Sequence, residues 1–197
     1  MATSVRIVNE AIFYFAKHGY EGTTLSQIAA EVGVKTPSLY AHFKSKEDIF
    51  FACLDAALDN DLTFFEEYFN QQHLSLEKLL YSILLEYEDR LSNNPMTMFC
   101  LRMIYFPPHD FKEQVILKAN ERDVLHGKLL YSLFENAQNQ GYLQNVTIQE
   151  AIEAYLCLFD GLMIELLYAG SVRFQHRLAA SWHIYTLGIF HPAEISS

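Results

Sequence analysis

The stretch that decides the fold is LSQIAAEVGVKTPSLYAHF, residues 25–43. Its apolar residues recur at three- and four-residue steps on both sides of Gly33-Val34, which predicts two short helices joined by a tight turn. Gly33 can take the positive φ that this turn requires. Ala29 is small where the two helices would cross closely. The pattern therefore predicts a helix-turn-helix, and its expected core side chains are Ile28, Val34, Leu39 and Phe43.

The same pattern leaves polar side chains on the outer side of the second short helix. The residues expected to face outward are Lys35, Thr36, Ser38, Tyr40 and His42. They are donors and acceptors of the kind that contact phosphates and base edges. Helix-turn-helix shapes also occur by chance in helical proteins, so the pattern alone fits a small helical subdomain that binds no nucleic acid as well.

Charge separates this stretch from the rest of the chain. The 197 residues carry a net charge of −10, which taken alone argues against a nucleic-acid partner. Residues 1–46 hold five Lys or Arg and three Asp or Glu, a net +2, whereas residues 47–197 carry −12. We therefore expect two domains with different partners, residues 1–46 and residues 47–197.

The whole chain has the pattern of helices. Ser or Thr followed three residues later by Gln, Asp or Glu marks helix starts after Thr24, Ser45 and Thr147, and Gly or Pro marks the ends. The pattern predicts an all-α protein of about nine helices, and the fourth helix joins the two domains. The predicted helices lie near 4–18, 25–32, 37–43, 46–72, 76–93, 95–106, 111–140, 147–169 and 174–189.

A set of residues at fixed spacing extends the signal over about the first quarter of the chain. The set is Ile7, Ala11, Phe15, Gly19-Tyr20, Thr23-Thr24, Ile28-Ala29, Gly33-Val34, Leu39-Tyr40, His42-Phe43 and Lys46-Glu47. In this set the chain resembles the N-terminal domain of the TetR family of bacterial transcription regulators. The rest of the chain resembles the family in helix count, length and architecture. The resemblance implies a three-helix DNA-binding domain followed by a larger ligand-binding and dimerisation domain.

The resemblance also implies roles for single residues at a double-stranded DNA operator. The second short helix would enter the major groove, and Thr24 and Lys46 would hold phosphates at helix N-termini. Pro37 departs from the family, because many members carry Gly or another small residue there, so base preference cannot be copied from relatives. The implied DNA contacts are Thr24, Lys35, Thr36, Pro37, Ser38, Tyr40, His42 and Lys46.

Aromatic and Met side chains are concentrated in residues 47–197. Each alone is more typical of a core than of a binding site, but as a set they can line an adaptable apolar cavity. The resemblance places an effector pocket among the equivalent helices. Arg102 would pair with a ligand carboxylate or with an acidic residue of the protein, and Asp160 would anchor a ligand or face solvent. The predicted pocket residues are Phe65, Tyr68, Tyr87, Phe99, Arg102, Met103, Tyr105 and Asp160.

The last two predicted helices are apolar on more than one face, which indicates packing on two sides. The resemblance implies that they pair with their copies in a homodimer, and burial within one chain is the alternative. The predicted interface residues are Leu158, Gly161, Glu165, Leu178, Trp182 and Tyr185.

These patterns favour a ligand-responsive transcriptional repressor. It would bind a palindromic operator as a homodimer and release it on binding a small apolar or aromatic effector. The alternative is a helical binding or scaffold protein without sequence-specific DNA function. The chain has no P-loop or hydrolase motif. Its two suggestive histidine pairs, His109 with His126 and His176 with His183, have no cysteine or carboxylate at ligand spacing beside them. We therefore expect no enzyme, metal or cofactor. Charges interrupt the most apolar stretch and no signal peptide is evident, so we expect a cytoplasmic protein without a membrane partner.

Overall fold

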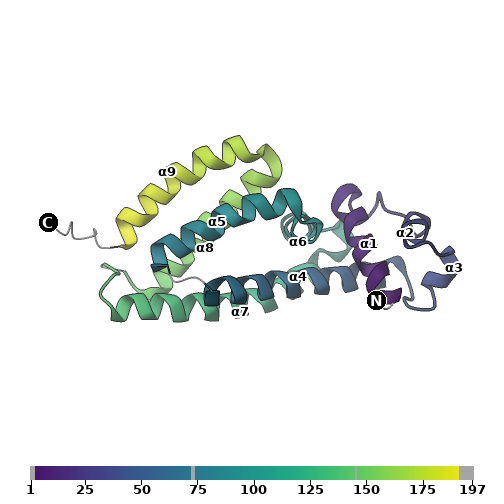
Figure 1. Ribbon diagram of the computed structural model, residues 1–197, viewed down its shortest axis with the longest axis horizontal. Coiled ribbons are helices and arrows are strands. Elements are labelled where there is room, and N and C mark those ends of the chain that lie inside the picture. Colours follow the sequence, from purple (N-terminus) through teal and green to yellow (C-terminus); the bar gives the residue numbers. More distant parts are fainter. Residues whose placement is uncertain (1–2, 72–73, 145, 191–197) are drawn as a thin grey trace. The chain divides into compact units, whose positions relative to one another are not determined.

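The computed structural model describes residues 3–71, 74–144 and 146–190 (Figure 1). Over these ranges the chain forms nine α-helices and one short 3-10 helix, which confirms the all-α prediction. The α-helices are α1 (Thr3–His18), α2 (Leu25–Val32), α3 (Thr36–Leu39), α4 (Lys46–Gln71), α5 (Leu76–Asn93), α6 (Pro95–Tyr105), α7 (Lys112–Asn139), α8 (Ile148–Ala169) and α9 (Ser171–Ile189), and the 3-10 helix is η1 (His109–Phe111).

The chain divides into two units. Unit 1 runs to Phe64 and includes Arg90–Arg122, and unit 2 is Phe65–Asp89 with the chain from Asp123 onward. The divisions fall within α4, α5 and α7. The predicted domain boundary at residue 46, which rests on motif and charge, falls inside unit 1. The division into a DNA-binding and a ligand-binding domain at that residue stays a prediction.

Unit 1 has an aromatic core that joins three helices. Phe15 of α1, Phe50 of α4 and Phe99 of α6 are fully buried. Their ring centroids lie 5.5 to 6.1 Å apart, within the range in which aromatic rings attract each other. Burial of these rings therefore holds the first helix of the predicted DNA-binding domain against α4 and α6.

The predicted helix starts are confirmed at Thr24 and Thr147. Each is an N-cap with a complete capping box, in which the Thr side chain and the side chain three residues later bond each other's backbone amides. Before α4 the pattern differs, because the Asp48 amide donates to the Ser45 hydroxyl at 3.0 Å while the Asp48 carboxylate accepts from the Lys44 amide at 2.9 Å. The carboxylate thus reaches one residue further back than in a capping box.

The third helix is shorter than predicted. We expected residues 37–43 to be helical, but α3 ends at Leu39 and residues 40–42 form turns. The Tyr40, Ala41 and His42 amides each bond the carbonyl three residues back, and the Leu39 carbonyl accepts from both the His42 and the Phe43 amide. The chain therefore tightens into three-residue turns after Leu39, as helix ends often do.

Unit 2 is held by α8, α9 and the part of α5 that it contains. The Tyr155 hydroxyl of α8 donates to the Leu80 carbonyl of α5 at 3.0 Å, and the Tyr185 hydroxyl of α9 donates to the Ala151 carbonyl of α8 at 3.0 Å. Phe190 forms an isolated antiparallel bridge with Leu143. Among the described helices, none combines the length and the apolar character that crossing a membrane would require.

Candidate nucleic-acid interface

The α2–α3 turn has the geometry that the sequence predicts. Gly33 has φ of 76°, in the left-handed region, and the Val34 amide donates to the Ala29 carbonyl at 2.9 Å. Arg6 of α1 donates to the Val32 carbonyl at 2.9 Å, so α1 caps the end of α2. Ile28 and Leu39 are buried beneath the turn, and Val34 and Phe43 are half-buried. The helix-turn-helix is therefore a packed frame.

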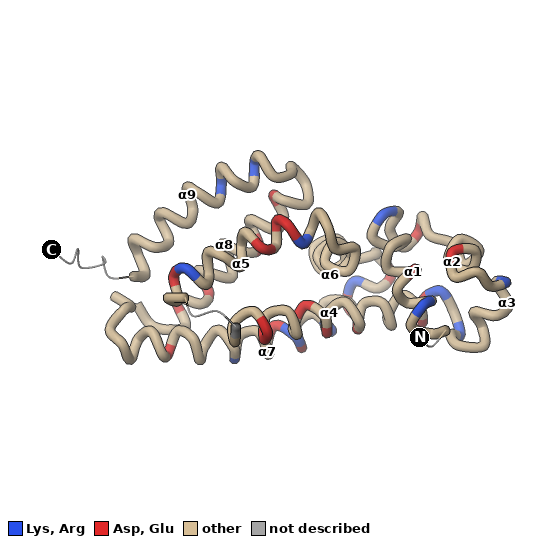
Figure 2. The backbone as a smooth tube through the Cα atoms, in the orientation of Figure 1, with Lys and Arg blue, Asp and Glu red and all other residues tan. Residues whose placement is uncertain are grey.

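The outer side of this frame carries the predicted DNA-contacting side chains of residues 35–42. Lys35, Pro37, Ser38, Tyr40 and His42 are exposed, and Thr36 is half-buried. Tyr40 leaves 57% of its surface in solvent although it is large and partly apolar. Figure 2 shows Lys and Arg beside α3. The frame thus presents hydroxyl, imidazole and ammonium groups on a short exposed segment.

The two predicted phosphate ligands differ in how they are held. Thr24 is exposed, and its hydroxyl is occupied by the capping box with Gln27. Lys46 begins α4 and is half-buried, with its ammonium 4.1 Å from the centroid of the Tyr20 ring, a cation–π contact. Burial lowers the pKa of Lys46, and the nearby Glu21 carboxylate opposes that shift. Lys46 is therefore positioned by Tyr20.

The predicted pocket residues fall into both units. Phe65, Tyr68, Tyr87 and Asp160 belong to unit 2, whereas Phe99, Arg102, Met103 and Tyr105 belong to unit 1. The Phe65 and Tyr87 ring centroids lie 5.7 Å apart. Phe99 is part of the unit 1 core, which is the alternative that the sequence favoured for a single aromatic residue. A joint pocket of all eight residues stays a prediction.

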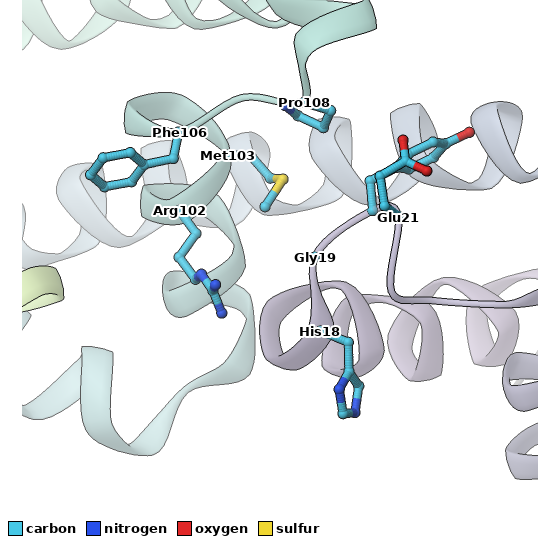
Figure 3. A pocket seen from close by; sticks show the side chains of 8 residues that line it. His18, Gly19, Glu21, Arg102, Met103, Phe106 and Pro108 are labelled. Atoms are coloured by element: carbon cyan, nitrogen blue, oxygen red, sulfur yellow. The ribbon is translucent and has the colours of Figure 1, made fainter.

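Unit 1 contains a cleft that includes two of the predicted pocket residues, Arg102 and Met103. It has a volume of about 270 Å³. Arg102 donates to the Ala16 carbonyl near the end of α1 (Figure 3). Phe106 belongs to the aromatic set of residues 47–197 that the sequence predicts to line a cavity, whereas Tyr20 was assigned to the family motif and was missed as a ligand contact. The cleft is lined by His18, Gly19, Tyr20, Glu21, Arg102, Met103, Phe106 and Pro108.

The comparison with known proteins finds a family match for the first domain. Residues 7–53 match the family described as bacterial regulatory proteins, tetR family. The matched segment runs from α1 through the helix-turn-helix into α4. Residues 7–53 are therefore similar to the DNA-binding domain of the TetR family.

Two relatives extend the match beyond the first domain. The chain is 34% identical over 102 residues to the biofilm operon icaADBC HTH-type negative transcriptional regulator IcaR of Staphylococcus aureus, and this match covers 46% of this chain and 54% of IcaR. It is 35% identical over 86 residues to the HTH-type transcriptional repressor ComR of Escherichia coli K12, which covers 44% of this chain and 39% of ComR. The match thus spans about half the length of these relatives or less.

Solved structures match almost the whole chain. A TetR transcriptional regulator from Chloroflexus aurantiacus has a TM-score of 0.78 at 18% identity, over 96% of this chain and 97% of that one. The fatty acid degradation regulator FadR from Bacillus halodurans has a TM-score of 0.73 at 17% identity, over 98% of both chains. At these identities the matches show a shared fold.

The residues predicted for a dimer interface differ in their exposure within unit 2. Leu178 and Tyr185 are buried within unit 2, as the alternative of burial within one chain predicts. The half-buried Trp182 ring lies 5.3 Å from the Tyr81 ring. Leu158 is half-buried and Gly161 is exposed.

Glu165 is occupied within its own unit. Its carboxylate pairs with Arg173 at 2.8 Å and with Arg177 at 3.2 Å, both from α9. These pairs explain an acidic residue in an apolar helix without a ligand. Other apolar side chains of α8 and α9 are exposed. They are absent from the predicted interface because an apolar pattern does not show which face of a helix unit 2 covers. They are Ile164, Tyr168, Val172, Ile184 and Leu187.

Proposed function

We propose that the protein is a ligand-responsive transcriptional repressor that binds a palindromic operator as a homodimer. The observation that carries the proposal is the exposed row of polar side chains at residues 35–42 on a buried helix-turn-helix frame. In this motif the second helix lies in the major groove, where side chains reach base edges. The names of IcaR and ComR, a negative regulator and a repressor, support repression as the direction of control.

The DNA contacts divide into positioning and reading groups. Lys46 and Lys35 would hold phosphates, and the first turn of α2 after Thr24 would present backbone amides to a third. Ser38, Thr36 and Pro37 lie at the start of α3, where they would approach base edges. Tyr40 and His42 would contact the DNA backbone.

The apolar side chains exposed on α8 and α9 support dimerisation. Tyr168 is 88% exposed, Val172 78% and Ile184 69%. Several large apolar side chains exposed on two packed helices indicate a surface that another molecule covers. A second copy of the chain is the occupant that a palindromic operator requires, because each half-site takes one helix-turn-helix.

A small apolar or aromatic effector would release the DNA by shifting the population of dimers toward a spacing of the two DNA-binding domains that does not match the operator. The two heads of a dimer bind when their spacing matches the half-sites, and an effector that favours another spacing lowers operator affinity. Helix α4 runs from the DNA-binding residues into unit 2, so it is the element that would carry this change.

The proposal is tested by selecting duplexes from a random DNA pool with the purified protein. We expect enrichment of an inverted repeat whose half-sites are one helical turn or a multiple apart. Fluorescence anisotropy then measures affinity for that duplex and for a scrambled one. Lys35→Ala should weaken operator binding roughly tenfold. The matched control is Lys128→Ala on α7, which removes another exposed lysine and should leave affinity unchanged.

A pool without enrichment would contradict the repressor proposal. It would favour the alternative, a helical binding or scaffold protein whose helix-turn-helix reads no sequence. Equal affinity for the selected and the scrambled duplex would have the same meaning.

A further inference from the structure

The cleft of unit 1 is a place where a small molecule would touch both α6 and the DNA-binding domain. Met103 and Pro108 lie on one side of it and the segment Gly19–Glu21 on the other (Figure 3). We propose that this cleft binds a small organic carboxylate with an apolar body, and that binding weakens the hold on DNA. The second half of the proposal rests on the proposed DNA-binding function and names a site and a chemical class for its effector.

The lining favours a carboxylate on an apolar body. Arg102 is half-buried, and only one of its five N–H donors is used by the Ala16 carbonyl contact that the structure shows. A planar guanidinium is well suited to a carboxylate, which it can bind through two parallel hydrogen bonds. Met103, Pro108 and Tyr20 supply apolar surface to the cleft. Met103 is buried, and Pro108 and Tyr20 are half-buried.

The charges of the lining residues and the volume of the cleft limit the ligand further to a small carboxylate. Glu21 is the acidic residue of the lining, but it is exposed, so solvent screens it more than it screens Arg102. The volume of about 270 Å³ lies just below the range of ordinary ligand pockets, about 300–1,000 Å³. A molecule of the size of benzoate or phenylacetate is therefore the kind of ligand that fits.

Tyr20 connects the cleft to the DNA-binding surface. Tyr20 lines the cleft, and its ring also supports the Lys46 ammonium at 4.1 Å. A ligand that displaces Tyr20 would remove the contact that positions Lys46, a proposed phosphate ligand. Because coupling between two sites is reciprocal, DNA must weaken carboxylate binding by the same factor.

The binding half is tested by NMR on protein labelled at the methionine methyl groups, with Met103→Leu to assign the Met103 signal. Benzoate and phenylacetate at millimolar concentration should shift this signal to saturation, and benzamide and phenylacetamide should shift it far less. Arg102→Gln should weaken carboxylate binding roughly tenfold. Glu21→Gln should strengthen it, because the variant removes the opposing charge from an exposed position.

The control for these variants is Arg177→Gln, which removes an arginine of unit 2 and should change nothing at the cleft. Glu21→Gln keeps the test valid if Arg102→Gln fails to fold by circular dichroism. The site is wrong if neither carboxylate shifts the Met103 signal, if the amides bind equally well, or if Arg102→Gln leaves binding unchanged in a folded protein.

The coupling half is tested by anisotropy with the selected duplex. Phenylacetate should lower DNA affinity of the wild type and have no effect on Arg102→Gln. Carboxylate binding with unaltered DNA affinity would overturn the coupling but not the site. Failure of selective DNA binding would overturn the proposed function alone, since the NMR titration contains no DNA.

Discussion

At the scale of single residues, Lys46 combines a charge for DNA with a fixed position. A cation–π contact leaves the N–H donors of an ammonium available, so Lys46 can rest on Tyr20 and still meet a phosphate. Lys46→Ala should weaken binding to all duplexes similarly and lower the slope of log affinity against log salt by about 0.9. Anisotropy over a salt series measures the slope, with Lys78→Ala on α5 as the control. An unchanged slope with lost sequence preference would show that Lys46 reads bases.

The same contact predicts how DNA binding depends on pH. Burial lowers the pKa of Lys46, and only the protonated ammonium attracts a phosphate. As pH rises, Lys46 should lose its proton at a lower pH than a lysine with an ordinary pKa. The wild type should therefore begin to lose DNA affinity at that lower pH. The Lys46→Ala variant should lack this part of the loss. Identical alkaline profiles for the two proteins would contradict the assignment.

Tyr155 supports unit 2 through a buried hydroxyl. It is buried and donates to the Leu80 carbonyl, so Tyr155→Phe leaves that carbonyl without this donor and should cost about 1–3 kcal/mol of unfolding free energy. Urea unfolding measures the loss. Tyr131→Phe, at an exposed tyrosine of α7, should leave stability within about 0.5 kcal/mol.

Stability at high pH gives a second measurement on Tyr155. Burial raises its pKa well above 10.0, so the unfolded chain releases the tyrosine proton first. The protonated Tyr155 side chain contributes fully to the free energy of unfolding at a pH below its pKa in the unfolded chain. That contribution is lost as pH rises from there toward its pKa in the folded protein. Tyr155→Phe should therefore show a flatter fall of stability above about pH 10. The fall should not vanish, because burial also raises the pKa of Tyr185.

At the scale of elements, two glycines should respond to the same substitution with opposite sign. Gly33 ends α2 with φ of 76°, where a Cβ is strained, so Gly33→Ala should destabilise by about 1–2 kcal/mol. Gly127 lies within α7 and a Cβ there would meet open space, so Gly127→Ala should stabilise by about 0.5–1 kcal/mol. Urea unfolding of both variants decides it. Two changes of the same sign would refute the conformational explanation.

At the scale of the whole molecule, the exposed apolar side chains of α8 and α9 determine how dimerisation should be tested. A specific interface buries about 1,200–2,000 Å². Ile184→Glu and Tyr168→Glu should give folded monomers that lose operator affinity, because a charge would be buried at the interface without a partner. Sedimentation gives the mass and circular dichroism the helicity.

Two further variants separate the interface from the core. Leu117→Glu replaces a similarly exposed apolar residue on α7 and should leave the dimer intact. Trp182→Glu should destabilise unit 2, because the ring packs on Tyr81 and Tyr185 of its own chain. A wild type that is monomeric at micromolar concentration would contradict the two-half-site proposal.

Local chemistry was sufficient to predict most elements of this protein, and the family was inferred from a resemblance in the first quarter of the chain. The signals that predicted the helices act over about one helical turn, so a short stretch of sequence contains them completely. They are capping residues, positive-φ glycines and apolar residues at three- and four-residue spacing. Thr24, Gly33 and Thr147 were therefore placed correctly, and the helix-turn-helix was recognised. The end of α3 was predicted too late. The Leu39 carbonyl accepts from both the His42 and the Phe43 amide, so the helical and the tighter turn are locally similar.

Tertiary structure decided which side chains are available. An apolar side chain has the same pattern whether its own chain or another molecule covers it, so Leu178 and Ile184 look alike in sequence although one is buried and the other exposed. The partners of Glu165 and Arg102 lie on other helices, and the cleft joins residues 18–21 with residues 102–108. Such sites depend on long-range packing, because the hydrophobic effect has no direction and leaves the pairing of surfaces to the complete fold.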